Sequence, residues 1–111
     1  MTILHTVLGP RIVVAVNGDL DLKTAQPLRD ALDQLIDRYP DKNLLLDLAE
    51  VDFVDSSGIG VILGRYRKLT ERHRTMSLAG VKPALRTVLE LAGIFSIIAV
   101  VDSPVRKEAE Q

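Results

Sequence analysis

The chain has 111 residues, a length that fits one domain with a single core. Its 14 Lys and Arg against 15 Asp and Glu give a formal net charge of -1, so no strongly basic field is available to hold nucleic acid or an anionic membrane. The absence of cysteine excludes a disulfide framework, thiolate chemistry and Cys-ligated metal sites. Met1 to His5 lack the features of a signal peptide, and no apolar run approaches the roughly 20 residues that span a bilayer. We therefore expect a single cytoplasmic domain that binds neither nucleic acid nor membrane.

Short apolar runs alternate with segments of helical periodicity, which indicates an α/β fold. The first two runs, Ile3 to Leu8 and Ile12 to Val16, flank the turn residues Gly9-Pro10-Arg11 and predict an antiparallel hairpin near an edge of the sheet. A third run, Leu44 to Leu48, is almost continuously apolar, as expected of a central strand covered on both faces. Two shorter runs complete a set of five strands: Met76 to Ala79 and Ile97 to Val101.

Three helices are predicted between these strands. Apolar residues recur at helical spacing from Thr24 to Tyr39, with Thr24 as the N-cap and Pro27 in the first turn. A second stripe runs from Ile59 to Leu69, and a third helix opens at Pro83 and stops before Gly93. The order is ββαβαβαβ, and because helical crossovers make the later strands parallel, we expect a mixed, mostly parallel sheet with helices packed on it.

The densest local signal is the segment VDFVDSSGIG at residues 51–60, between the central strand and the second helix. Functional loops of an open α/β sheet gather at the carboxyl ends of the strands, where a helix N-terminus presents unpaired N–H groups and partial positive charge. Ser56 or Ser57 can cap this helix, while Gly58 and Gly60 leave its first turn open to the close approach of another molecule. The same residues are also ordinary loop chemistry, and from residue types alone both readings stay open.

One further segment has two possible interpretations, and the aromatic residues have one. Gly18-Asp19-Leu20-Asp21 precedes the first helix and is either a recognition edge or a solvated turn with Asp21 near the helix start. The aromatic side chains Phe53, Tyr66 and Phe95 are predicted to lie in the core or at its edge rather than around a ligand.

Enzymatic chemistry has little support in the sequence. A nucleophilic serine needs a base, and the two histidines, His5 in the first strand and His73 in a charged loop, are remote from the serines in the predicted layout. The glycine spacing around residue 58 is not the dinucleotide fingerprint, and no phosphate-loop motif occurs. The histidines and carboxylates lack the spacing of metal ligands. We expect no catalytic residue, no metal and no cofactor.

The segment Val51 to Arg67, VDFVDSSGIGVILGRYR, closely resembles the STAS domain family, and within it the bacterial anti-sigma factor antagonists of sporulation and stress regulation. The resemblance extends over NGDLDLKTAQPLRDAL at residues 17–32 and AGVKPALRTVLELAGIFSII at residues 79–98. It implies a single STAS domain over residues 1–111 with a sheet of about five strands. Residues 102–111 are then a polar tail, either a short helix or disordered, where the family usually has a final helix.

The resemblance also implies a protein-binding switch rather than an enzyme. In such proteins the unphosphorylated form binds an anti-sigma factor, itself a serine kinase, and frees the sigma factor for transcription. The kinase then phosphorylates the serine after the motif's aspartate, here Ser56, and a serine phosphatase resets the protein. By the same carry-over Asp55, Ser56, Ser57, Gly58 and Gly60 form the contacted loop, and Asp21 faces the kinase. The free protein is expected to be a monomer.

Two alternatives remain beside this reading. A STAS module can be a subunit of a lipid-transport or sensory assembly, in which the serine is only a cap. A small serine hydrolase or phosphotransferase would instead use Ser56 covalently.

Overall fold

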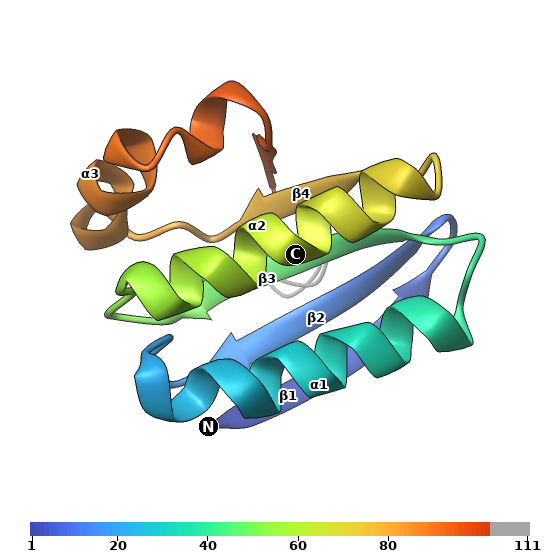
Figure 1. Cartoon of the computed structure of the whole chain (residues 1–111), viewed down its shortest axis with the longest axis horizontal. Coiled ribbons are helices and arrows are strands. Elements are labelled where there is room, and N and C mark those ends of the chain that lie inside the picture. Colours follow the sequence, from blue (N-terminus) through green and yellow to red (C-terminus); the bar gives the residue numbers. More distant parts are fainter. Residues whose placement is uncertain (103–111) are drawn as a thin grey trace, which may run out of the picture.

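The computed structural model describes residues 1–102, which form one five-stranded mixed sheet with three α-helices (Figure 1). The strands lie in the order β1-β2-β3-β4-β5; β1 and β2 are antiparallel and the later neighbours are parallel. This confirms the predicted α/β class and ββαβαβαβ order. The predicted tail lies outside the described residues apart from Asp102. The elements are β1 (Thr2–Leu8), β2 (Arg11–Asn17), α1 (Leu22–Arg38), β3 (Asn43–Glu50), α2 (Ser56–Glu71), β4 (Met76–Ala79), α3 (Pro83–Leu91), the 3₁₀ turn η1 (Ile94–Ser96) and β5 (Ala99–Val101).

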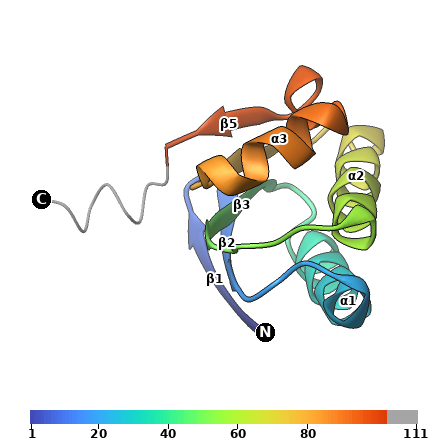
Figure 2. The ribbon, with the colours of Figure 1, turned by 90° about the vertical axis from the view of Figure 1, so that its left-hand side faces the viewer.

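The helices α1 and α2 lie side by side against one face of the sheet (Figure 2). Between these layers the core is aliphatic, because alternate residues of each strand point toward the helices and meet their apolar stripes. Its largest fully buried side chains are Ile12, Leu20, Leu28, Leu32, Ile36, Leu44, Leu46, Leu48, Ile62, Leu69 and Leu78.

The strand β3 is buried on both faces. Leu44 and Leu46 belong to the helix-side core, while Leu45 joins Val13 and Ala79 in a smaller cluster on the opposite face. The prediction of a central strand from the continuous apolar run is therefore confirmed.

Two of the predicted turns contain glycines with a positive φ. Gly9 has a φ of +58° in the tight β1–β2 connection, and Gly93 has a φ of +78° just after α3. Both are left-handed conformations that glycine adopts without strain, so the predicted hairpin and helix stop are confirmed.

The start of α1 differs from the prediction. Asp21, not Thr24, is the N-cap: its carboxylate accepts hydrogen bonds from the backbone N–H groups of Lys23 and Thr24. The Thr24 hydroxyl oxygen accepts in return from the Asp21 N–H at 3.0 Å, which completes a capping box. Pro27 consequently lies inside the helix rather than in its first turn, on the exposed side where water can reach the carbonyl that lacks a donor.

Two further expectations are corrected at the periphery. The last strand begins at Ala99 rather than Ile97, because residues 94–96 turn in a 3₁₀ helix and bury Ile98 beside the core. Phe53 is 50% exposed and does not belong to the core, whereas Tyr66 and Phe95 pack against its edge as expected.

An ion network joins the outer faces of α1 and α2. Arg65 Nε lies 3.0 Å from Asp33 Oδ1 without a well-aligned hydrogen bond, and Lys68 reaches both Asp33 and Asp37. Arg72 Nη1 lies 2.9 Å from Asp37 Oδ1. A hydrogen bond from Arg72, and to a smaller extent one from Lys68, holds the pKa of Asp37 below its ordinary value. The network therefore holds α1 beside α2 through charge as well as apolar packing.

The lowered pKa of Asp37 gives a pH-dependent prediction. A carboxylate whose folded pKa is depressed stabilises the protein above its unfolded pKa and loses this effect as the pH falls through the folded pKa. Asp37→Asn should lower the urea midpoint slightly at about pH 7, because the pair is exposed and the effect small. The difference from wild type should close on acidification to below about pH 4. Asp41→Asn, which removes an exposed carboxylate outside the network, is the control. A difference in urea midpoint between wild type and Asp37→Asn that stays unchanged in acid would contradict this explanation.

Candidate functional site

Two helices begin next to each other at the carboxyl ends of neighbouring parallel strands. The chain passes from β2 to α1 through residues 18–21 and from β3 to α2 through residues 51–55. Leu20 and Val54 form an isolated parallel bridge between these loops. The Leu20 N–H donates to the Phe53 carbonyl at 2.9 Å, and the Asp55 N–H donates to the Leu20 carbonyl at 3.0 Å. The loops that carry Asp21 and Ser56 are therefore one hydrogen-bonded unit.

An aspartate caps the start of α2, as Asp21 does for α1. Asp55 Oδ1 accepts from the backbone N–H groups of Ser57 at 2.8 Å and Gly58 at 3.2 Å. The expectation that Ser56 or Ser57 is the N-cap is wrong, because the carboxylate one position earlier already binds these donors and matches the positive end of the helix better than a hydroxyl. Both serines are thereby free of a capping role.

Ser56 is the first residue of α2 and its side chain faces solvent. Within residues 1–102 its hydroxyl has no hydrogen-bond partner, so it is accessible to an incoming group. Ser57, the next residue, is half-buried. Of the two serines, Ser56 is thus the better placed for reaction with another protein.

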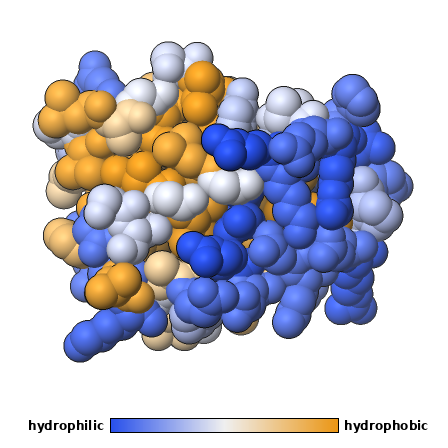
Figure 3. Space-filling view, in the orientation of Figure 1, coloured by the Kyte–Doolittle hydropathy of each residue, from blue (hydrophilic) through white to orange (hydrophobic). Residues whose placement is uncertain are grey.

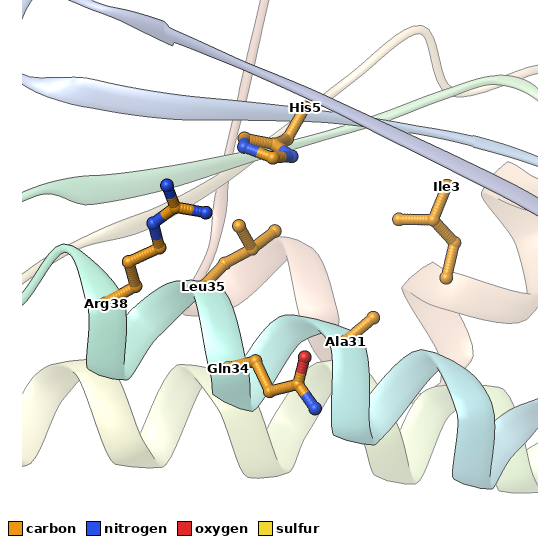
Figure 4. A pocket seen from close by; sticks show the side chains of 6 residues that line it. All are labelled: Ile3, His5, Ala31, Gln34, Leu35 and Arg38. Atoms are coloured by element: carbon orange, nitrogen blue, oxygen red, sulfur yellow. The ribbon is translucent and has the colours of Figure 1, made fainter.

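Neither histidine lies near Ser56. His73 follows the C-terminal end of α2, and at 1.5 Å per residue this helix of 16 residues separates it from Ser56 by about 24 Å. His5 on β1 borders a different hollow, where Figure 4 shows it above Leu35 with Arg38 of α1 beside it. Within residues 1–102 a histidine base is therefore missing beside Ser56, which weakens the hydrolase alternative.

The two glycines of the motif have different environments. A Cβ on Gly58 would lie 2.6 Å from the carbonyl oxygen of Leu20 and 2.7 Å from its Cβ. Gly58 is buried, and the lack of a side chain lets the start of α2 pack against Leu20. The first turn of α2 is therefore not open to another molecule at this position. The expectation of an open approach at this position is corrected. A Cβ on Gly60 would meet nothing within 4 Å, and this exposed position keeps the predicted openness.

Between the starts of the two helices lies a hollow of about 330 Å³. It is lined from α1 by Leu22, Ala25, Gln26 and Arg29, and from α2 by Ser56, Ser57 and Gly60. Sequence reasoning missed the α1 side of this groove. The spacing of positions 22, 25, 26 and 29 places them on one helix face, but only the packing of α1 beside α2 shows what they face.

Apolar side chains are exposed around the same loops. Leu22 is 78% exposed and Phe53 is 50% exposed. Figure 3 shows apolar surface over α3 and the first half of α2, and a hydrophilic surface over the far ends of α1 and α2. An exposed apolar patch of this kind is typical of a protein-interaction surface.

Among residues 1–102 no cluster of three or more His, Asp or Glu side chains is arranged to hold a metal ion. Over the same residues no helix is long and apolar enough to cross a membrane.

Comparison with known proteins identifies the family. The sequence model of the STAS domain matches residues 3–109, and the chain belongs to the STAS family. It is 33% identical over 99 residues to the anti-sigma F factor antagonist of Paenibacillus polymyxa, covering 89% of this chain and 85% of that protein. It is also 33% identical over 92 residues to the anti-sigma-B factor antagonist of Listeria monocytogenes, covering 80% and 77%.

Solved structures share the fold. An anti-sigma factor antagonist from Mycobacterium paratuberculosis superposes with a TM-score of 0.82 at 24% identity, covering 98% of this chain and 92% of that one. Unphosphorylated SpoIIAA gives a TM-score of 0.72 at 21% identity, covering 98% and 96%. The named antagonists are regulatory binding proteins, which agrees with the expectation that this chain is not an enzyme.

The contrast between Gly58 and Gly60 gives a matched pair of variants. Gly58→Ala should destabilise the fold by about 1–3 kcal/mol, because its methyl group overlaps the Leu20 backbone. Gly60→Ala should be neutral or stabilise by up to about 1 kcal/mol, because alanine favours a helix and space is available. Urea unfolding of both variants and wild type measures the difference. Equal stabilities of the two variants would contradict the close approach of α2 to Leu20.

Proposed function

We propose that this protein is an anti-sigma factor antagonist that is switched by phosphorylation of Ser56. In its unmodified form it binds an anti-sigma factor that is a serine kinase, and so releases the sigma factor. Phosphorylation ends this binding and a serine phosphatase restores it. The observation that carries the proposal is the exposed, unbonded Ser56 hydroxyl directly after the Asp55 cap, at the edge where two helix starts and exposed apolar side chains meet.

The modification is a simple phosphoryl transfer. The γ-phosphoryl group of ATP passes to Ser56 Oγ, the bond between this phosphorus and the bridging oxygen of ADP breaks, and the hydroxyl proton is released. The products are ADP and a phosphoserine with about -1.5 to -2 charge near pH 7. The nucleotide and catalytic groups belong to the kinase, so this chain supplies only the acceptor.

The Asp55 cap makes the switch local. Its carboxylate already binds the Ser57 and Gly58 amides, so a phosphoryl group on Ser56 need not displace any hydrogen bond of the fold. The new charge instead adds to that of Asp55 on the surface a partner would cover. Desolvating it on docking, at a cost of roughly 4 kcal/mol, corresponds to about a thousandfold loss of affinity.

The structures of SpoIIAA support a switch without refolding. This chain superposes on the unphosphorylated and the phosphorylated forms with the same TM-score of 0.72, at 21% and 22% identity. Both forms of that protein therefore have the fold described above.

The fold alone does not choose between an antagonist and a subunit of a transport or sensory assembly. A sulfate transporter family protein from Wolinella succinogenes also superposes, with a TM-score of 0.73 at 19% identity. The accessible Ser56 favours the antagonist, because a serine that only caps a helix would bond to its N–H groups, and Asp55 does so instead.

The proposal also includes the surface that meets the kinase and the setting in which the protein acts. The surface that meets the kinase includes Asp21, Asp55, Ser57 and Gly60. Buried Gly58 supports this surface by letting the start of α2 pack against Leu20. The protein acts in the cytoplasm, where ATP and sigma factors are found, and is a monomer when free. Its regulatory programme is sporulation or a stress response.

Mass spectrometry after incubation with the cognate anti-sigma factor kinase and ATP tests the assignment. Wild type and Ser57→Ala should each gain one phosphoryl group on Ser56, because this hydroxyl is the exposed one. Ser56→Ala should gain none, should keep its affinity within a few-fold, and should not be released by ATP. Phosphate on Ser57 or on a remote residue of the wild-type protein would contradict the proposal.

A further inference from the structure

The groove between α1 and α2 places one cation opposite Ser56. Ala25 on α1 and Gly60 on α2 are small, and the remaining lining residues are polar or charged apart from Leu22. Arg29 is the one charged residue among those that line it, and it lies on α1 across from the start of α2. An anion attached to Ser56 would therefore have a guanidinium group on the facing wall.

Arg29 makes no ion pair within residues 1–102. Its contact within residues 1–102 is a hydrogen bond from Nη1 to Gln26 Oε1 at 3.3 Å, and it has no carboxylate partner there. By contrast, Arg65, Lys68 and Arg72 of α2 are paired with α1 carboxylates. The Arg29 side chain is exposed and can turn toward a new anion without breaking an ion pair.

The helix start beside Ser56 does not offer an equal alternative. Asp55 already binds the Ser57 and Gly58 amides and places a negative charge beside the modified serine. A phosphoryl group therefore meets the charge of Asp55 on the α2 side, whereas the charged residue that lines the α1 side of the groove is Arg29. A guanidinium group can donate two parallel hydrogen bonds to phosphate oxygens, which a lysine cannot do.

Resting on the function proposed above, we propose that Arg29, oriented by its hydrogen bond to Gln26 Oε1, binds the phosphoryl group of phosphorylated Ser56 across the groove. Arg29 is then a positioning residue: it holds the phosphate between α1 and α2 and fills the groove in the modified protein. The unmodified protein keeps the groove open for its partner.

The test uses the full chain with phosphoserine installed at position 56 during translation, so that it does not depend on any kinase. A ³¹P NMR titration gives the second pKa of the phosphoserine, which is about 6 when unperturbed. Asp55 raises this pKa and a bound guanidinium lowers it. We expect Arg29→Gln to raise the midpoint by about 0.5 pH unit or more, and Arg29→Lys to give an intermediate value. Arg38→Gln, on the same helix but beside a different hollow, is the control and should leave the midpoint unchanged.

The outcomes separate this proposal from the function on which it rests. Equal midpoints in wild type and Arg29→Gln would overturn the role of Arg29, whether or not phosphorylation ends partner binding. A kinase that fails to modify Ser56 would overturn the proposed function and leave the Arg29 measurement valid. Circular dichroism of each variant checks the fold, and Arg29→Lys retains the charge if Arg29→Gln should unfold.

Discussion

The contact between Leu20 and Gly58 is the constraint on which the functional edge depends. A side chain at position 58 would overlap the Leu20 carbonyl, so glycine lets α2 start against the loop that precedes α1. Backbone hydrogen bonds of Leu20 with Phe53 and Asp55 join the same two segments. Together they place the capped starts of both helices next to each other, which creates the groove and presents Ser56 at its margin.

Charge then determines what this edge can do. The carboxylates of Asp21 and Asp55 accept hydrogen bonds from the backbone N–H groups at the two helix starts, so the fold leaves the Ser56 hydroxyl unbonded and accessible. A buried serine cap would have to break a structural hydrogen bond to be modified, whereas Ser56 does not. The cap and the accessible hydroxyl thereby belong to two adjacent residues, Asp55 and Ser56, so a change at the hydroxyl need not alter the core.

Much of this architecture could be predicted from the sequence because it depends on local patterns. The continuous apolar run of β3 indicated a central strand, and the glycines at 9 and 93 indicated turns. The third helix opens at Pro83 as predicted, whereas the N-caps of α1 and α2 were missed by one to three residues, because Asp, Ser and Thr all cap helices and only the three-dimensional hydrogen bonds show which one does. The role proposed for Arg29 could not be predicted, because it depends on how α1 packs beside α2, a helix that lies far away in sequence. The structural use of Gly58 likewise required the position of Leu20.

The most direct test of the account is titration calorimetry of the anti-sigma factor with two forms of this protein, unmodified and phosphorylated on Ser56. The account predicts that the phosphorylated form binds about a thousandfold more weakly while both forms give the same circular dichroism spectrum. Equal affinities of the two forms would contradict it.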